Sequence, residues 1–169
     1  MALLRRGPHL PDDVRSRLDL RRGERVVAIG ELTQGWAAAT LRGLYIALTD
    51  QPVTHRAWSD VDGARLNAAE AELTLTWVDG AQPTTLHLAD DRSPALARTV
   101  HERVQASVVH TEKVTLPSGA VVRVALRRDP DQNLLTQVLG TGDVDLTDPA
   151  TAELVDAAEA RVREAAGLT

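Results

Sequence analysis

The fold is decided by residues 73–108, whose sequence is LTLTWVDGAQPTTLHLADDRSPALARTVHERVQASV. From Leu73 to Trp77 large apolar residues occupy every second position, which is the period of a strand buried on one face. Asp79-Gly80 predicts a turn, and Thr84 to Leu88 predicts the antiparallel strand that returns from it. This stretch therefore predicts a β-hairpin with one apolar face.

A helix is predicted directly after the hairpin, from Pro94 to Val108. Ser93 is suited to the N-cap and Pro94 to the first helical position. The apolar residues of this segment then recur on one helical face, and they are Leu96, Ala97, Val100, Val104 and Val108. Such a stripe has to cover another apolar surface, and the strands before it offer one. We therefore expect Leu96, Val100 and Val104 to pack beside Leu73, Leu75 and Leu86.

Five further strands are predicted upstream of the hairpin from alternating apolar residues bounded by turn signals. They cover Glu24 to Leu32, Trp36 to Leu41, Leu44 to Thr49, Val53 to Trp58 and Val61 to Asn67. Together with the hairpin they make about seven antiparallel strands. The economical arrangement is an antiparallel barrel closed by the helix that follows, or a strongly bent double sheet with the helix in the gap between its two halves.

A second, smaller unit is predicted after the barrel. Lys113 to Leu116 and Val121 to Leu126 form a hairpin, Leu134 to Leu139 is a third strand, and Asp148-Pro149 begins a final helix. The expected fold class is α+β. The expected domains are a helical segment over residues 1–23, a barrel with its capping helix over 24–108, and a small α+β unit over 109–169 that packs on the first.

Three motifs in the barrel carry a resemblance to a known family. They are Ala39-Thr40-Leu41-Arg42-Gly43-Leu44-Tyr45-Ile46, Trp58-Ser59-Asp60-Val61 and the helix from Pro94 to Val108. In this order residues 24–108 resemble the bacterial pleckstrin-homology-like (PH-like) superfamily. The resemblance implies a partly open barrel of about seven strands with a C-terminal helix in one end. From Val109 onward the chain is similar to actinobacterial proteins in which a second α+β unit follows the barrel.

The resemblance also bears on lipid binding. Members that bind phosphoinositides use a basic cluster around the first strand pair. The corresponding loop here is Glu31-Leu32-Thr33-Gln34-Gly35, which contains no cation. We therefore do not expect this chain to bind a lipid headgroup.

Composition limits the possible classes of function. The chain has 169 residues, a formal net charge of -5 and no cysteine, so it can form neither a disulfide nor a thiolate zinc site. No segment approaches the ~20 apolar residues of a membrane helix, and the N-terminus has no signal-peptide core. We expect a cytoplasmic protein without membrane insertion.

Neither the histidines nor the acidic residues form a metal-binding pattern. The five histidines are scattered without helical pairing, at His9, His55, His87, His101 and His110. Asp143-Val144-Asp145 and Asp148 do not match a calcium loop, and Asp148 is better suited to cap a helix. We therefore expect surface or sheet-edge histidines and no bound metal.

Signals for phosphate binding and for nucleophilic catalysis are equally weak. Gly140-Thr141-Gly142 is followed by neither a Walker lysine nor an adjacent helix. Ser93 and Ser118 are explained by a cap and a turn, and no serine occupies a nucleophile elbow. We expect no cofactor and no catalytic residues, so whether the chain is an enzyme stays open, with a binding protein favoured.

The remaining candidates are aromatic and cationic side chains. Trp36, Trp58, Trp77 and Tyr45 are predicted to fill the core, because they lie on alternating strands. Arg123, Arg127 and Arg128 form the best candidate for an exposed cationic partner surface, although a solvated outer face explains them as well.

Several functions remain open. We expect a non-catalytic interaction module whose protein partner docks on a sheet edge or on the second unit, with a second copy of the chain as another possible partner. One alternative is a small-ligand-binding protein or an enzyme with a site in the groove between the barrel and the C-terminal unit. A second alternative is weak nucleic-acid binding through the arginines.

A pair of substitutions tests the predicted strand faces. Trp77→Ala should cost about 3–5 kcal/mol of the free energy of unfolding, because it truncates a large core side chain. Arg127→Ala should cost under about 0.5 kcal/mol if Arg127 lies on a solvated face. Denaturant midpoints for the two variants measure this order, and the reverse order would mean that the faces are inverted.

Overall fold

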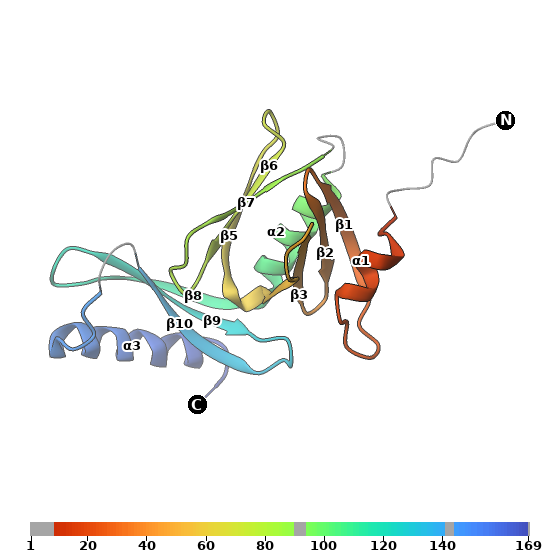
Figure 1. The fold of residues 1–169 in the computed structure, drawn as a ribbon. Helices are drawn as coiled ribbons and strands as arrows, with labels where there is room; N and C mark the ends of the chain where they lie inside the picture. Colours follow the sequence, from red (N-terminus) through yellow and green to blue (C-terminus); the bar gives the residue numbers. More distant parts are fainter. Residues whose placement is uncertain (1–8, 90–93, 141–143, 169) are drawn as a thin grey trace. The chain divides into compact units, whose positions relative to one another are not determined.

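The computed structural model describes residues 9–89, 94–140 and 144–168. The chain is an α+β protein with three antiparallel sheets, and it divides into two compact units, Met1–Val104 and Gln105–Thr169 (Figure 1). The first unit contains α1 (Asp12–Arg17), β1 (Val26–Leu32), β2 (Gly35–Thr40), β3 (Gly43–Leu48), β4 (Thr54–Ala57), the 3-10 turn η1 (Trp58–Asp60), β5 (Val61–Asn67), β6 (Glu72–Trp77), β7 (Thr84–His87) and most of α2 (Ala95–Ser107). The second contains β8 (Val108–Thr115), β9 (Val121–Arg128), β10 (Leu134–Gly140) and α3 (Pro149–Ala165).

All seven strands predicted before α2 are present, but they do not form a closed barrel. β1, β2, β3 and β4 form a first sheet and β5, β6 and β7 form a second. The chain turns at η1 between β4 and β5, which ends the first ladder before the second begins. The two sheets also meet where β1 and β7 end. Among the described residues, one isolated bridge connects them there, between Leu32 and Leu88. The expected closed barrel is therefore corrected to two sheets joined at their corners.

Side chains from both sheets and from α2 fill the interior between the two sheets. Leu96, Val100 and Val104 of α2 belong to one buried cluster with Leu73, Leu75 and Leu86, as the sequence predicted. A glycine on β1 lets the helix approach closely, because a Cβ on Gly30 would lie 2.6 Å from Cδ2 of Leu96. The helix therefore supplies the part of the core that the sheets leave open.

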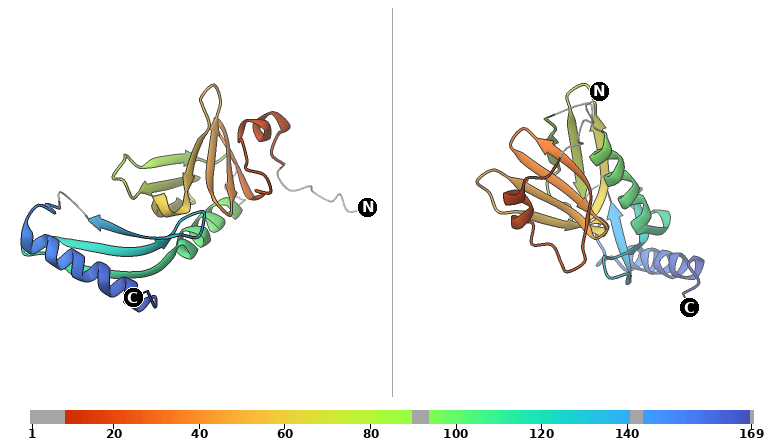
Figure 2. Two further views of the ribbon diagram at one scale, coloured as in Figure 1. Left: turned by 90° about the horizontal axis from the view of Figure 1, so that it is seen from below. Right: turned by 90° about the vertical axis from the view of Figure 1, so that its right-hand side faces the viewer.

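The first sheet is buried on its other face as well. Leu10, Val14 and Leu18, which predicted a helix from their spacing, pack with Ala38, Tyr45 and Ala47 in a separate cluster. Neighbouring strand residues point to opposite faces, and Ala37, Ala39, Leu44 and Ile46 belong to the interior cluster. Figure 2 shows α1 and α2 on opposite sides of the β1–β4 sheet.

The corner between the two sheets is fixed by a buried tryptophan. Trp58 begins η1 and is buried, and its indole Nε1–H donates a hydrogen bond to the carbonyl of Thr40, 2.9 Å away. This bond connects the corner to the end of β2. Trp58, Trp77 and Tyr45 are all buried, which confirms their prediction as core residues, whereas Trp36 is only partly buried.

The second unit is a three-stranded sheet, β8-β9-β10, covered on one face by α3 (Figure 2). Val122, Val124 and Leu126 of β9 form a cluster with Val155, Ala158 and Val162 of α3, among others. Asp148 caps the helix as predicted, because its carboxylate accepts hydrogen bonds from the backbone N–H and the hydroxyl of Thr151.

One predicted boundary in this region is wrong. The helix was expected to reach Val108 and the next strand to begin at Lys113, but α2 ends at Ser107 and β8 begins at Val108. Val108 continues the four-residue spacing of the helix, yet Val108 and Val109 are β-branched. Val108 pairs with Arg127 in the sheet, with a register shift before His110. The periodicity of the helix therefore extended past its true end.

The expected exposure of Arg127 is also wrong. Its side chain is only 2% exposed, and its guanidinium donates hydrogen bonds to the hydroxyl of Ser107. Arg123 is half-buried and Arg128 is exposed. Alternation places Arg123 and Arg127 on the same face of β9, but that face is not solvated around Arg127.

Some sequence predictions fall on residues outside the described part of the chain, namely Ser93 as a helix cap, Thr141 and Gly142 of the glycine-rich turn, and Asp143 of the acidic loop. Among the residues that the structure does describe, no helix is long and apolar enough to cross a membrane.

The environment of Arg127 changes the expected cost of removing it. Arg127→Ala should cost about 1–3 kcal/mol, because the substitution removes a buried charged donor to Ser107. Arg128→Ala is the matched control on the same strand and should cost under about 0.5 kcal/mol. Chemical denaturation of both variants measures the difference, and equal midpoints would contradict the buried position of Arg127.

Candidate functional site

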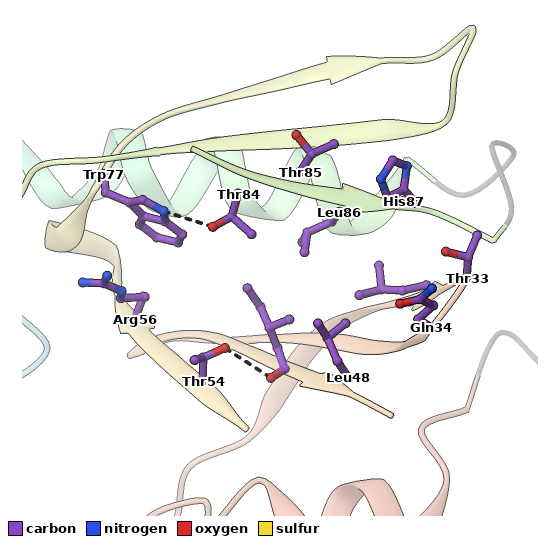
Figure 3. Close-up of a pocket in the computed structure, with 12 residues that line it drawn as sticks. Thr33, Gln34, Leu48, Thr54, Arg56, Trp77, Thr84, Thr85, Leu86 and His87 are labelled. Carbon is purple, nitrogen blue, oxygen red and sulfur yellow. Dashed lines mark hydrogen bonds between the residues drawn. The ribbon is translucent and has the colours of Figure 1, made fainter. Parts of the chain in front are cut away.

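The main candidate site is a pocket within the first unit, between its two sheets (Figure 3). It has a volume of about 400 Å³, which is within the range of small-ligand pockets. The pocket opens where the expected barrel would have closed. It is lined by Leu32, Thr33, Gln34, Ile46, Leu48, Thr54, Arg56, Trp77, Thr84, Thr85, Leu86 and His87.

The lining combines an apolar floor with polar side chains around it. Leucine, isoleucine and tryptophan side chains from both sheets supply the floor, and threonine hydroxyls and the amide of Gln34 lie around it. The wall at Trp77 is held in place, because its indole Nε1–H donates a hydrogen bond to the hydroxyl of Thr84, 3.1 Å away. This surface suits a group that is largely apolar with a few hydrogen-bonding atoms.

The two basic side chains at the rim each lie against a carboxylate. Nη1 of Arg56 lies 3.0 Å from a carboxylate oxygen of Asp79, and its guanidinium carbon lies 4.9 Å from the centre of the Trp77 ring. Nδ1 of His87 lies 3.2 Å from a carboxylate oxygen of Glu72. A hydrogen bond from the backbone N–H of Ala81, and then the one from Arg56, lower the pKa of Asp79, which keeps this carboxylate charged. The positive charge of Arg56 at the rim is therefore compensated.

The pocket also lies between two strands that stand last in their sheets. β4 is the last strand of the first sheet and β7 is the last strand of the second. Each is only four residues long. The apolar floor is thus bordered by two short strand edges.

A separate group of titratable side chains lies at the start of the first sheet. The carboxylate of Glu24 accepts hydrogen bonds from the hydroxyl of Thr40 at 2.6 Å and from the phenol of Tyr45 at 3.2 Å. The ring of His55 stacks on Tyr45 with 4.2 Å between centroids. These contacts connect the N-terminal segment to β2, β3 and β4, which gives the group a structural role.

The pKa values in this group follow from burial and hydrogen bonding. Burial raises the pKa of Tyr45, and the neighbouring charge of Glu24 adds to it, so that it reaches about 12. Burial acts in the same direction on Glu24, but hydrogen bonds from Thr40, Arg21 and Tyr45 outweigh it and lower the pKa of that carboxyl. Burial also lowers the pKa of His55. At neutral pH the group is an ionised Glu24 with a neutral tyrosine as its donor.

The residues predicted from the sequence do not meet at the pocket. Arg123, Arg127 and Arg128 all lie on β9 of the second unit. All five histidines are exposed, as predicted, and His87 alone of them lines the pocket. Within the described ranges no group of three or more histidine and acidic side chains could hold a metal ion.

The pocket itself was not found from the sequence. Alternation correctly placed Leu86 on the inner face of its strand. It does not indicate which of the inner side chains border an unfilled space, and a pocket can be predicted only from that information. Its lining comes from five strands and the β1–β2 turn, spread between Leu32 and His87. No local pattern connects such residues, although the short, charged segment around Arg56 was a signal for a strand at an edge.

No protein-family model matches this chain, and comparison with curated proteins and with solved structures also gives no match. The geometry of the pocket and of the strands around it is therefore what bears on function.

Tyr45 allows a direct test of the hydrogen-bonded group, because it is the only tyrosine of the chain. Its pKa is raised from 10.0 to about 12, so the stability it contributes is present below pH 10 and is lost as the pH rises toward 12. Titration of tyrosinate absorbance in the folded protein should show a midpoint near the higher value. Glu24→Gln should lower the midpoint, and a wild-type midpoint near 10.0 would contradict the contact.

Proposed function

We propose that this protein is a non-catalytic interaction module on a PH-like scaffold, and that the pocket between its two sheets receives an apolar group of the partner. The observation that carries the proposal is the pocket of about 400 Å³ with an apolar floor bordered by hydroxyl and amide groups. Binding sites for small groups are typically concave and mostly apolar, with a few polar groups that fix the orientation of what binds.

The arrangement of the first unit supports a PH-like scaffold. Four antiparallel strands are followed by three, and a C-terminal helix then enters the core between the sheets. That is the element order which the resemblance of residues 24–108 implies. Because one scaffold can support many functions, the proposal depends on the pocket and not on the fold.

The pocket is suited to binding without large rearrangement. Its Trp77 wall is held by Thr84 and by the guanidinium of Arg56, and Leu86 is fully within the core cluster. Walls that are already ordered lose little conformational entropy when a ligand enters. Each apolar CH₂ group that leaves water then contributes about 0.8 kcal/mol.

The polar groups around the pocket favour recognition over proton transfer. Arg56 and His87 are held at the rim by Asp79 and Glu72. The threonine hydroxyls and the Gln34 amide do not ionise at physiological pH, and they suit hydrogen bonds that orient a ligand. We therefore expect binding without chemical conversion of the bound group.

Methyl NMR of the full chain with two small apolar probes, indole and cyclohexanol, tests the pocket. At about 1 mM of either probe, the signals of Ile46, Leu48 and Leu86 should shift in a saturable way. Leu48→Trp should abolish the response by filling the pocket. Leu66→Trp is the matched control, because Leu66 is 40% exposed on β5 and outside the lining.

Saturable shifts confined to methyl groups of the pocket lining would support the proposed site. Absence of shifts in the wild type, or an equal response in the Leu48→Trp variant, would overturn it.

A further inference from the structure

The outer edge of β7 has a defined hydrogen-bonding pattern. On its inner side β7 pairs with β6 in antiparallel register, with Leu86 opposite Leu73 and Thr85 opposite Thr74. Just after the strand, the N–H of Leu88 donates to the carbonyl of Ala71, 2.7 Å away, which continues the ladder on the β6 side. In an antiparallel ladder only alternate residues turn their backbone groups toward a given neighbour.

This alternation directs the backbone of Thr85 away from β6. Leu86 and Leu88 are two residues apart, so the backbone groups of both bond on the β6 side. The residues that alternate with them, Thr85, His87 and Ala89, therefore turn their N–H and C=O groups to the outer edge. The last two of these residues already bond there. The Thr85 groups lie at the same edge, beside the pocket that Thr85 itself lines.

The chain uses part of this edge itself. The N–H of Thr33 donates to the carbonyl of His87, and the N–H of Ala89 donates to the carbonyl of Glu31, both at 2.9 Å. The end of β1 thus acts as a short strand against the end of β7. The outer edge therefore accepts a strand in its present conformation, and its next pairing position is Thr85 (Figure 3).

The floor of the pocket lies beside that position. Leu86 and Thr84 point into the pocket from β7, and Leu48 of β3 faces them (Figure 3). Ile46 of β3 also lines the pocket. A segment that pairs at Thr85 would alternate its side chains between the two faces of its own strand. One face of the segment then meets the apolar floor.

The charges around the pocket restrict which segment fits. Arg56 is paired with Asp79, and His87 lies against the carboxylate of Glu72, so neither side chain offers an uncompensated positive charge to an acidic group. A charged side chain placed on the apolar floor would lose its hydration without a counter-charge. An uncharged side chain therefore matches the apolar floor best.

We propose that the partner group is an extended, uncharged peptide segment that pairs with the outer edge of β7 at Thr85 and places an apolar side chain in the pocket. Main-chain hydrogen bonds hold the segment, and the pocket selects its side chain, as in other cases of strand addition to a sheet edge. This inference rests on the proposed function, because it uses the same pocket.

Selection from a phage-displayed random peptide library on the immobilised full chain supplies the probe. The selected sequences are then synthesised with blocked ends and their affinities are measured by calorimetry. We expect segments with apolar residues at alternate positions and no charge at the residue that enters the pocket.

Two substitutions at one residue separate the backbone from the side chain. Thr85→Pro removes the outward N–H and leaves the backbone bonds to β6, and both variants lose the hydroxyl contact with Thr74. The proline variant should therefore weaken peptide binding about tenfold or more. Thr85→Ala keeps that N–H and should leave the affinity within about threefold of the wild type. Binding of indole, read from the Leu48 methyl signals, should persist in both variants and confirms that the pocket is intact.

A second measurement leaves the protein unchanged. N-methylation of the selected peptide at single backbone amides should abolish binding at alternate positions only, which is the signature of strand pairing. Uniform tolerance of N-methylation, equal affinities of the proline and alanine variants, or selection of charged side chains for the pocket would each overturn the inference. If no peptide is selected while indole still binds, the inference fails and the proposed function stands; if neither binds, both fail.

Discussion

Burial of the β1–β4 sheet on both faces is the constraint on which the first unit depends. Ala37 and Ala39 face the interior between the sheets, and Ala38 faces the cluster beneath α1. All three are almost completely buried. Their small side chains let layers approach the sheet from both sides, so α1 covers one face while α2 and the second sheet share the other. What remains uncovered is the gap between the β4 and β7 edges, which is where the pocket lies.

Sequence reasoning succeeded where one local period determined the answer. The alternation from Leu73 to Trp77 identified the buried face of β6, and the stripe ending at Val104 identified the side of α2 that enters the core. Asp148 was recognised as a cap because the requirements of a helix N-terminus involve only the next three residues. In each case the determining contacts lie within one element or between neighbours along the chain.

Sequence reasoning failed where the exposure of a residue depends on which other element covers that face of its strand. Alternation put Arg123 and Arg127 on one side of β9 but carries no information on whether that side is solvated, and Arg127 is buried. The register shift at Val108 gave β8 a different start from that expected. The pocket escaped detection for a related reason, because closure of a barrel depends on whether two distant edges meet, and neither edge has a signal for its partner. The strand edges and the pocket that indicate a function therefore exist only in the three-dimensional arrangement.

The contact between Gly30 and Leu96 has a consequence for how such a chain can diverge. Any side chain at position 30 would meet a leucine that is itself fully buried, so a larger residue at position 30 alone would move α2 away from β1, and a smaller residue at position 96 alone would leave a cavity. A larger residue at position 30 would require a smaller one at position 96, and the two positions should covary among relatives although they are distant in sequence. Such a pair would be an epistatic link between a strand and a helix, and it would mark relatives that keep this core.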